Sequence, residues 1–299
     1  SEVQKPQRTI PIALILSVVL STILYVLLQL AFLGSIPTEM LNGGWAEVSK
    51  QFSLPYRDIA ITLGMGWLAF MVISDAIISP SGTGNIYMNA TPRVIYGWAK
   101  AGTFFKAFTH IDKASGIPRP ALWLTFGLSI FWTLPFPSWE QLISVVSAAL
   151  VLSYAIAPVT AAGLRRNAPD LPRPFRVRAF AIIGPVSFMV SALIVYWSGW
   201  NTLSWLLGLQ IVMFVVYVMC KGKVPEHTVS LAQQVKSSLW LIAFYALIIL
   251  FSWLGSFGGL NVIGHPWDTV LVAAMSLGIY YWGARSCLPQ ANFSGDEEE

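Results

Sequence analysis

Residues 10–33 read IPIALILSVVLSTILYVLLQLAFL, an apolar run without a single charged side chain. A helix crosses the bilayer core with about 20 such residues, so this stretch predicts a membrane span. Similar stretches recur along the chain, and the sequence therefore predicts an all-α, polytopic transmembrane helical bundle of eight spans. The predicted spans are Ile10–Leu33, Ile59–Ser79, Ala121–Phe136, Gln141–Leu164, Phe180–Trp197, Leu203–Cys220, Leu239–Gly255 and Trp267–Trp282.

The composition of the 299 residues agrees with a membrane protein. Hydrophobic residues make up 56% and charged residues only 11%, with a mean hydropathy of +0.65. An average soluble domain has about 25% charged residues. The chain therefore carries more apolar surface than a soluble globule can bury.

The basic residues are distributed unevenly among the segments between the predicted spans. All but two of the 18 Lys and Arg residues, Lys50 and Arg57, fall into one set of alternate segments. Such segments stay in the cytoplasm during insertion. We therefore expect a multi-pass protein of the cytoplasmic (inner) membrane, with both ends of this chain on the cytoplasmic side. Topology also explains the net charge of +4, so the lipid bilayer is expected as a partner and nucleic acid is not.

The sequence offers little for catalysis or metal binding. The three histidines, His110, His227 and His265, lack the spacing of a metal site, and Cys220 with Cys287 cannot build a disulfide framework. No cofactor, metal or catalytic residue is expected. A membrane-embedded enzyme would have to use His265 and Asp268, the only candidate acid–base pair.

Several short motifs follow one another in an order that resembles a known family. They are Glu2-Val3 with Pro6, Arg8 and Ile10-Pro11; Ser81–Asn85 followed by Arg93–Gly102; Gly116–Pro120; Leu152–Pro158; and Arg173–Arg176. In combination they resemble amino acid permeases of the amino acid, polyamine and organocation transporter superfamily. Within it, the chain is most similar to the bacterial aspartate–proton symporter group, which also carries two extra C-terminal helices.

The resemblance implies a fold and a function. Residues 1–220 would correspond to helices seven to twelve of an inverted-repeat transporter, and residues 221–299 to two additional helices with an acidic tail. The chain would then be a fragment without the broken helices that bind the amino acid substrate. The implied function is secondary active transport by symport, with H⁺ rather than Na⁺ as the coupling ion. A non-transporting scaffold or receptor is the alternative, followed by the membrane-embedded enzyme.

Asp75 is the residue least compatible with its predicted span. An acid near the centre of a membrane helix costs about 2.5 to 3.5 kcal/mol, so it should face a partner, water or the bundle interior. Three interpretations stay open at this point. Asp75 binds a coupling ion or proton, it is a structural acid bonded to another helix, or it is a surface residue beside a span that begins elsewhere.

A polar run follows Asp75 on the cytoplasmic side. Hydropathy alone ends the span before this run, whereas the resemblance carries the eighth helix through it to about Arg93. The resemblance implies that small hydroxyl residues line a cation site and that Tyr87 points toward the substrate. Ordinary helix packing explains the same residues equally well. The candidates beside Asp75 are Ser79, Ser81, Thr83, Asn85 and Tyr87.

Overall fold

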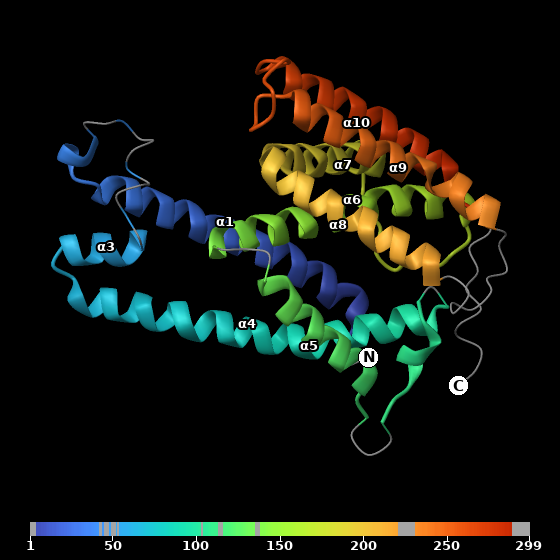
Figure 1. The fold of residues 1–299 in the computed structure, drawn as a ribbon, viewed down its shortest axis with the longest axis horizontal. Helices are drawn as coiled ribbons and strands as arrows, with labels where there is room; N and C mark the ends of the chain where they lie inside the picture. The colour runs from blue at the N-terminus through green and yellow to red at the C-terminus, as the bar shows by residue number, and fades with distance from the viewer. Residues whose placement is uncertain are drawn as a thin grey trace. The chain divides into compact units, whose positions relative to one another are not determined.

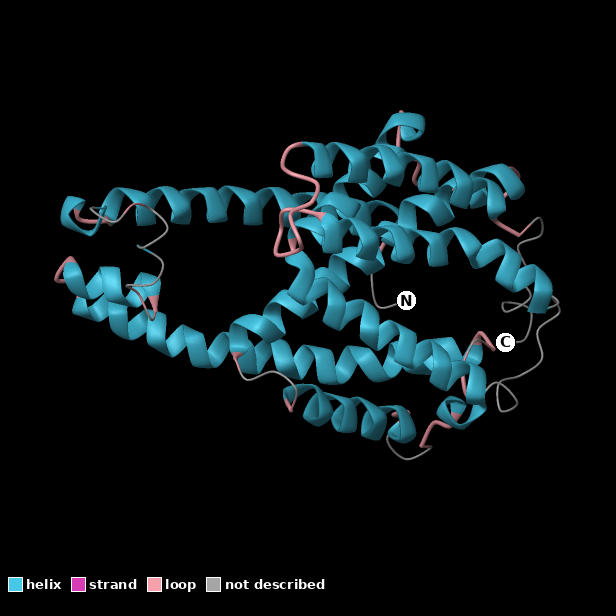
Figure 2. Ribbon diagram, turned by 45° about the horizontal axis from the view of Figure 1, so that its top comes forward, coloured by secondary structure: helices cyan, strands magenta, loops and turns pink. Residues whose placement is uncertain are grey.

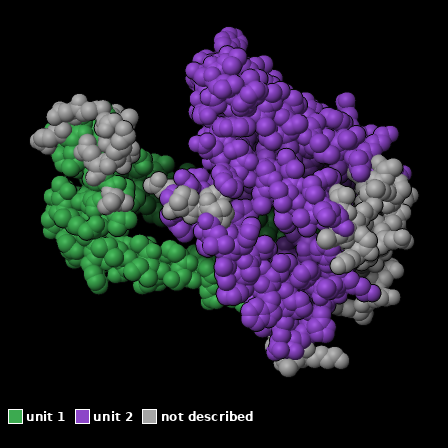
Figure 3. Space-filling model, viewed as in Figure 1, with its two compact units in different colours: residues 1–90, 173–176 green, residues 91–172, 177–299 purple. Residues whose placement is uncertain are grey.

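A computed structural model describes residues 4–41, 44, 48, 52, 54–102, 104–112, 116–134, 138–220 and 231–288. These residues form helices joined by loops, without a strand among them, as the sequence predicted (Figure 2). The chain divides into two compact units, residues 1–90 with 173–176 and residues 91–172 with 177–299 (Figure 3).

The first unit begins with α1 (Pro6–Ser35), the helix formed by the apolar run of residues 10–33 (Figure 1). Leu14, Ile15 and Leu16 point in three directions around it and expose 62%, 61% and 53% of their surface. A helix that is apolar on every side belongs in a membrane or a large core. Its 30 residues span about 45 Å, more than the hydrocarbon thickness of a bilayer.

A small core joins the end of α1 to the next helices. After α1 come η1 (Thr38–Leu41) and α3 (Pro55–Thr62). Ile36, Val48 and Ile59 are buried together. The ring of Phe32 packs edge-on against Phe52 and Tyr56, with centroids 5.9 and 5.8 Å apart. Apolar contacts therefore hold the end of α1 beside α3.

The predicted span Ile59–Ser79 is wrong in its first part, because the chain turns inside it. α3 ends at Thr62, and the backbone N–H of Met65 bonds to the carbonyl of Ala60 at 2.8 Å. Gly64 has a φ of +73°, a conformation that glycine adopts without strain and that commonly ends helices. The long helix α4 (Gly66–Lys100) starts only after this turn.

α4 also extends further than predicted. It continues through Pro80 and Pro92 to Lys100, beyond the expected end near Arg93. The last turns of α4, from residue 91, belong to the second unit. They lead through η2 (Lys106–Thr109) into α5 (Arg119–Thr133), where Trp98 and Phe108 both pack on the ring of Phe104.

The second unit contains a bundle of five helices: α6 (Trp139–Asn167), α7 (Phe180–Trp197), α8 (Gly199–Cys220), α9 (Leu231–Leu254) and α10 (Trp267–Ser286). α6 packs on α7, α8 and α10, and α10 also packs on α7 and α9 (Figure 1). Phe188 of α7 lies at the centre of the core. Its ring centroid is 5.1 Å from that of Phe244 and 6.0 Å from that of Tyr280.

Small residues allow the bundle helices to approach closely. A Cβ atom added at Gly283 of α10 would come within 2.8 Å of both Val159 of α6 and Trp240 of α9. Membrane helices commonly use glycine in this way, because lipid offers no hydrophobic drive for helix association and contact must come from close packing. Gly283 therefore sets the distance between three helices.

Among the described residues, five helices are long and apolar enough to cross a membrane. They are Pro6–Ser35, Gln141–Asn167, Phe180–Trp197, Gly199–Val216 and Val235–Leu254. The predicted span Phe180–Trp197 has the bounds of α7. The other three predicted spans fall on α4, α5 and α10, and their crossing of the membrane stays a prediction. The division of the chain into two parts at residue 220 also stays a prediction.

Candidate functional site

The six candidate residues from the sequence all lie on α4 and form two rows. Asp75, Ser79, Thr83 and Tyr87 are spaced by four residues, so they follow one another along one side of the helix. Ser81 and Asn85 form a second row. With about 100° of rotation per residue, Ser79 and Ser81 point about 200° apart. α4 therefore carries polar groups on two opposite sides.

All six side chains are exposed, and the bonds that they make stay within α4. The hydroxyl of Ser81 donates to the carbonyl of Ile77 at 2.7 Å. The amide of Asn89 donates to the backbone and side-chain oxygens of Asn85, at 2.9 and 3.3 Å. In the described part of the chain, no other helix bonds to the candidates. The structure thus aligns them without completing a site around them.

The surroundings of Asp75 are apolar and exposed as well. Phe70, Ile77 and Ile78 expose 72%, 67% and 68% of their surface. Lipid would suit these neighbours but not a carboxylate, which costs about 2.5 to 3.5 kcal/mol at the centre of a membrane helix. The side of α4 that carries Asp75 is therefore suited to contact a polar surface, a water-filled path or an ion.

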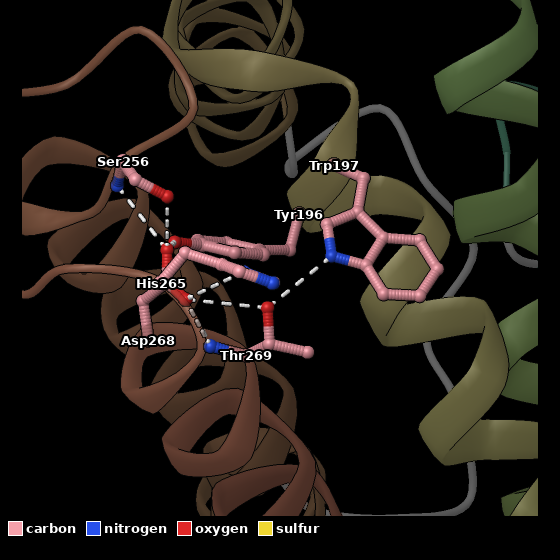
Figure 4. A network of polar contacts seen from close by, with 6 residues as sticks. All are labelled: Tyr196, Trp197, Ser256, His265, Asp268 and Thr269. Atoms are coloured by element: carbon pink, nitrogen blue, oxygen red, sulfur yellow. Dashed lines mark hydrogen bonds and ion pairs between the residues drawn. The ribbon is translucent and has the colours of Figure 1, made fainter.

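The buried carboxylate of the described chain is Asp268, in the first turn of α10. Its side chain is fully buried, and five hydrogen bonds converge on it (Figure 4). Oδ2 accepts from the hydroxyl of Tyr196 at 2.8 Å, from the backbone N–H of Ser256 at 3.2 Å and from the hydroxyl of Ser256. Oδ1 accepts from the N–H and the hydroxyl of Thr269, at 2.6 and 3.2 Å.

Further groups surround this network (Figure 4). Nδ1 of His265 lies 3.6 Å from Oδ1 of Asp268, and the indole N–H of Trp197 donates to the hydroxyl of Thr269 at 3.5 Å. Phe257 packs edge-on against the rings of Tyr196 and His265. The network joins the end of α7, the loop after α9 and the start of α10.

The geometry gives Asp268 a structural role. A carboxylate that accepts this many hydrogen bonds is stabilised in its ionised form, and removing it would leave buried donors without an acceptor. The hydroxyl of Ser256 donates to Asp268, so in this network His265 does not activate Ser256 as a nucleophile. The pair considered for an enzyme therefore acts as a link between helices.

The sequence did not predict that Asp268 links α10 to α7 and to the loop after α9. An acid in the first turn of a helix is favourable for the helix dipole, and that much is readable at Asp268. Its partner Tyr196 lies 72 residues away. A single sequence contains no signal that pairs the two.

A groove lies between α8 and α9. It has a volume of about 750 Å³ and is lined mainly by apolar side chains such as Leu207, Phe214 and Ile249. None of the candidate residues of α4 lines it. Among the described residues, no group of three or more His, Cys, Asp or Glu side chains could hold a metal ion.

Comparison with known proteins identifies the family. Residues 1–219 match the profile of the family described as amino acid permease, which covers more than half of the chain. The chain belongs to the amino acid permease family. This confirms the resemblance of the sequence motifs to the amino acid, polyamine and organocation superfamily.

Relatives of this chain include several bacterial transporters. It is 56% identical over 297 residues to an aspartate-proton symporter of Bacillus subtilis, covering 99% of this chain and 57% of the relative. It is 34% identical to the glutamate/serine transporter AimA of the same organism, covering 95% and 52%. The branched-chain amino acid permease BcaP is 22% identical, covering 74% and 46%.

The permease spans about half the length of these relatives. No solved structure matches it. The relatives are transporters, so a membrane-embedded enzyme is not supported, in agreement with the structural role of the His265–Asp268 pair. A multi-pass membrane protein is confirmed by the family and by the five long apolar helices.

Proposed function

We propose that this permease is part of a proton-coupled symporter that imports an acidic amino acid across the cytoplasmic membrane. The observation that carries the proposal is the 56% identity, over nearly the whole chain, to a protein named aspartate-proton symporter. The structure supports it with a long helix that presents an acid and hydroxyl groups along one side. The alternative of a scaffold without transport has no matching relative among those described above.

The proposed roles follow from the chemistry of the rows on α4. Asp75 binds and releases the coupling proton, because it is the acid whose surroundings in α4 leave it exposed to a path or a partner. Ser79 and Thr83 continue the row with hydroxyl groups that hydrogen-bond to water or to substrate. Ser81 and Asn85 bond mainly within α4 and serve helix packing. Tyr87, at the end of the first row, faces the substrate.

Uptake of labelled amino acids by the full-length gene product tests the proposal. Proteoliposomes with an imposed proton gradient, acidic outside, should accumulate labelled aspartate above its external concentration. Collapse of the gradient by a protonophore should stop accumulation, while replacement of Na⁺ by K⁺ should not. Accumulation that needs Na⁺, or the absence of any uptake of acidic, neutral or branched amino acids, would contradict it.

The proposed topology places both ends of this chain in the cytoplasm, and exposed loop positions allow a sharp test. Val262 exposes 69% of its surface in the loop before α10, and Asp170 is exposed after α6. In a protein without other cysteines, Val262→Cys should react with a membrane-impermeant maleimide from outside intact cells. Asp170→Cys should react only after permeabilisation. The reverse pattern would invert the topology.

A further inference from the structure

The groove between α8 and α9 opens on the outer surface of the described helix bundle. Ile211 and Phe214 of α8 and Ile242 of α9 line it, and they expose 60%, 59% and 50% of their surface. Both helices contain a stretch that is long and apolar enough to cross a membrane. The groove therefore lies on a surface that a bilayer would cover.

The lining of the groove selects an apolar occupant. Its polar side chains are Ser238 and the pair Gln210 and Tyr245, which hydrogen-bond to each other across the two helices. Oε1 of Gln210 is buried, so it offers an occupant no accessible acceptor. The other side chains that line the groove are apolar. Water is bound poorly by such a surface, because it finds too few polar partners there.

The length of the groove matches one leaflet of a bilayer. Along α9 its lining extends from Ser238 to Ile249, which corresponds to about 16 Å at a rise of about 1.5 Å per residue. The hydrocarbon core of a bilayer is about 30 Å thick, so the groove covers about half of it. A helix that crosses the membrane would extend well beyond the groove, whereas an acyl chain of one leaflet has a similar length.

The two ends of the groove on α9 differ in polarity. Ser238 is exposed and lies three residues after Val235, where the apolar span of α9 begins. Ile249 lies deeper in the same span and is apolar. The hydroxyl of Ser238 is therefore placed near the level of the lipid ester groups, where it is able to donate a hydrogen bond to a carbonyl oxygen. In the proposed topology this end of the groove faces the cytoplasm.

We propose that the groove binds one acyl chain of a phospholipid from the cytoplasmic leaflet, with its ester group at Ser238 and its methyl end beside Ala246 and Ile249. Lipid gives apolar helices no hydrophobic drive to associate, so the chain is held by close contact with both walls of the groove. The choice of leaflet rests on the proposed topology, whereas the binding itself does not. The binding is also independent of the transported substrate.

Photolabelling of the full-length protein in lipid nanodiscs tests the proposal. A phosphatidylglycerol with a diazirine at the methyl end of one acyl chain should label residues 245–249, as located by mass spectrometry of the peptides. A diazirine next to the ester group should move the label to residues 238–242. Labelling of α7 and α10 at the same level as the groove, for both probes, would show only general lipid contact and would overturn the proposal.

Variants at Ala246 separate binding in the groove from contact with the bulk lipid. Ala246 lines the groove and is exposed, so larger side chains there fill the groove without disturbing the core. Ala246→Phe should lower the labelling of residues 238–249 severalfold, and Ala246→Leu should lower it less. The matched control is Ala274→Phe at an exposed position of α10, which should leave this labelling unchanged. Wild-type labelling in Ala246→Phe, with an unchanged unfolding temperature, would contradict the proposal.

Other occupants of the groove would give different labelling patterns. A second copy of the protein, or a helix from outside residues 1–299, would shield residues 238–249 from both probes while other exposed helices are labelled. That pattern would refute lipid binding in the groove. Stronger labelling by a free fatty acid with the same diazirine would assign the groove to a fatty acid instead of a phospholipid. Equal or weaker labelling by the fatty acid agrees with the proposal.

Discussion

The two acids Asp75 and Asp268 occupy opposite environments in this permease. Asp75 is exposed on α4, among apolar side chains that are also exposed. Asp268 is fully buried in the helix bundle and accepts five hydrogen bonds from Tyr196, Ser256 and Thr269. A carboxylate surrounded by fixed donors is stabilised in its ionised form. The contrast supports a structural role for Asp268, while the coupling role of Asp75 stays a proposal.

The largest expected effect is on stability at Asp268. Asp268→Ala removes the acceptor of the buried Tyr196 hydroxyl and of the half-buried donors of Ser256 and Thr269, and should lower the free energy of unfolding by about 3 kcal/mol or more. Thermal unfolding of the full-length protein in detergent, followed by fluorescence-detected size exclusion, measures it. Asp75→Ala is the control and should unfold near the wild-type temperature. Equal losses in both variants would remove the distinction between the two acids.

Two glycines of α10, one at a helix contact and one exposed, allow a test of how closely this helix is packed. Gly283→Ala would bring a Cβ atom within 2.8 Å of Val159 and Trp240, whereas Gly278→Ala meets open space. Overpacking costs about 1 to 3 kcal/mol, while alanine in place of an exposed helix glycine gains up to about 1 kcal/mol. We expect Gly283→Ala to lower the unfolding temperature and Gly278→Ala to preserve or raise it. The opposite order would contradict the packing of α10.

Gly84 allows a test of whether the exposed surface of α4 contacts another surface during transport. A Cβ atom at Gly84 meets nothing within 4 Å in this chain. If the polar rows of α4 contact another surface during transport, Gly84→Leu should reduce the uptake rate severalfold with little change in unfolding temperature. Gly278→Leu, in the bundle, is the matched control. Wild-type uptake by Gly84→Leu would mean that this side of α4 faces lipid.

A smaller effect is expected at Tyr196, which supplies one of the five donors to Asp268. Tyr196→Phe removes a single hydrogen bond and should lower the free energy of unfolding by about 1 kcal/mol. Because the other donors remain, the loss should be clearly less than for Asp268→Ala. A loss equal to that of Asp268→Ala would mean that the hydroxyl of Tyr196 holds the network alone.

The smallest effect concerns the pH dependence of a thiol in the bundle. Burial raises the pKa of Cys287 above its ordinary value of about 8.5, so less thiolate is present at a given pH. In a Cys220→Ser background, the midpoint of alkylation by iodoacetamide should lie at higher pH in the folded protein than in the unfolded one. A cysteine introduced at exposed Ser81 of α4 should react faster than Cys287 at pH 8. Coincident folded and unfolded midpoints would show that the partial burial of Cys287 does not raise its pKa.

Much of the fold could be predicted from the sequence, because apolar runs indicate the helices and basic segments indicate the connections between them. The span Phe180–Trp197 was predicted with the bounds of α7, since charges and a helix-ending Trp-Ser-Gly sequence flank it. The turn between α3 and α4 was missed, because Gly64 lies inside an apolar run that hydropathy treats as continuous. The length of α4 was underestimated, because hydropathy ends the span before the polar run and the family resemblance carries the helix only to about Arg93.

The candidate site was only partly readable. The polar rows of α4 follow from a spacing of four residues, and the structure confirms that Asp75, Ser79, Thr83 and Tyr87 lie on one helix. Their roles stay predictions. The Asp268 network depends on contacts between residues that are far apart in sequence, and such contacts are set by helix packing rather than by any local pattern.

Proton-driven accumulation by Asp75→Asn in the full-length protein shows whether Asp75 couples aspartate transport to the proton gradient. The variant should still exchange external labelled aspartate for internal aspartate, because asparagine resembles the protonated acid. It should fail to accumulate aspartate against a concentration gradient when only a proton gradient is supplied. Accumulation at the wild-type level would contradict the coupling role of Asp75, and loss of exchange together with a lowered unfolding temperature would assign it a structural role like that of Asp268.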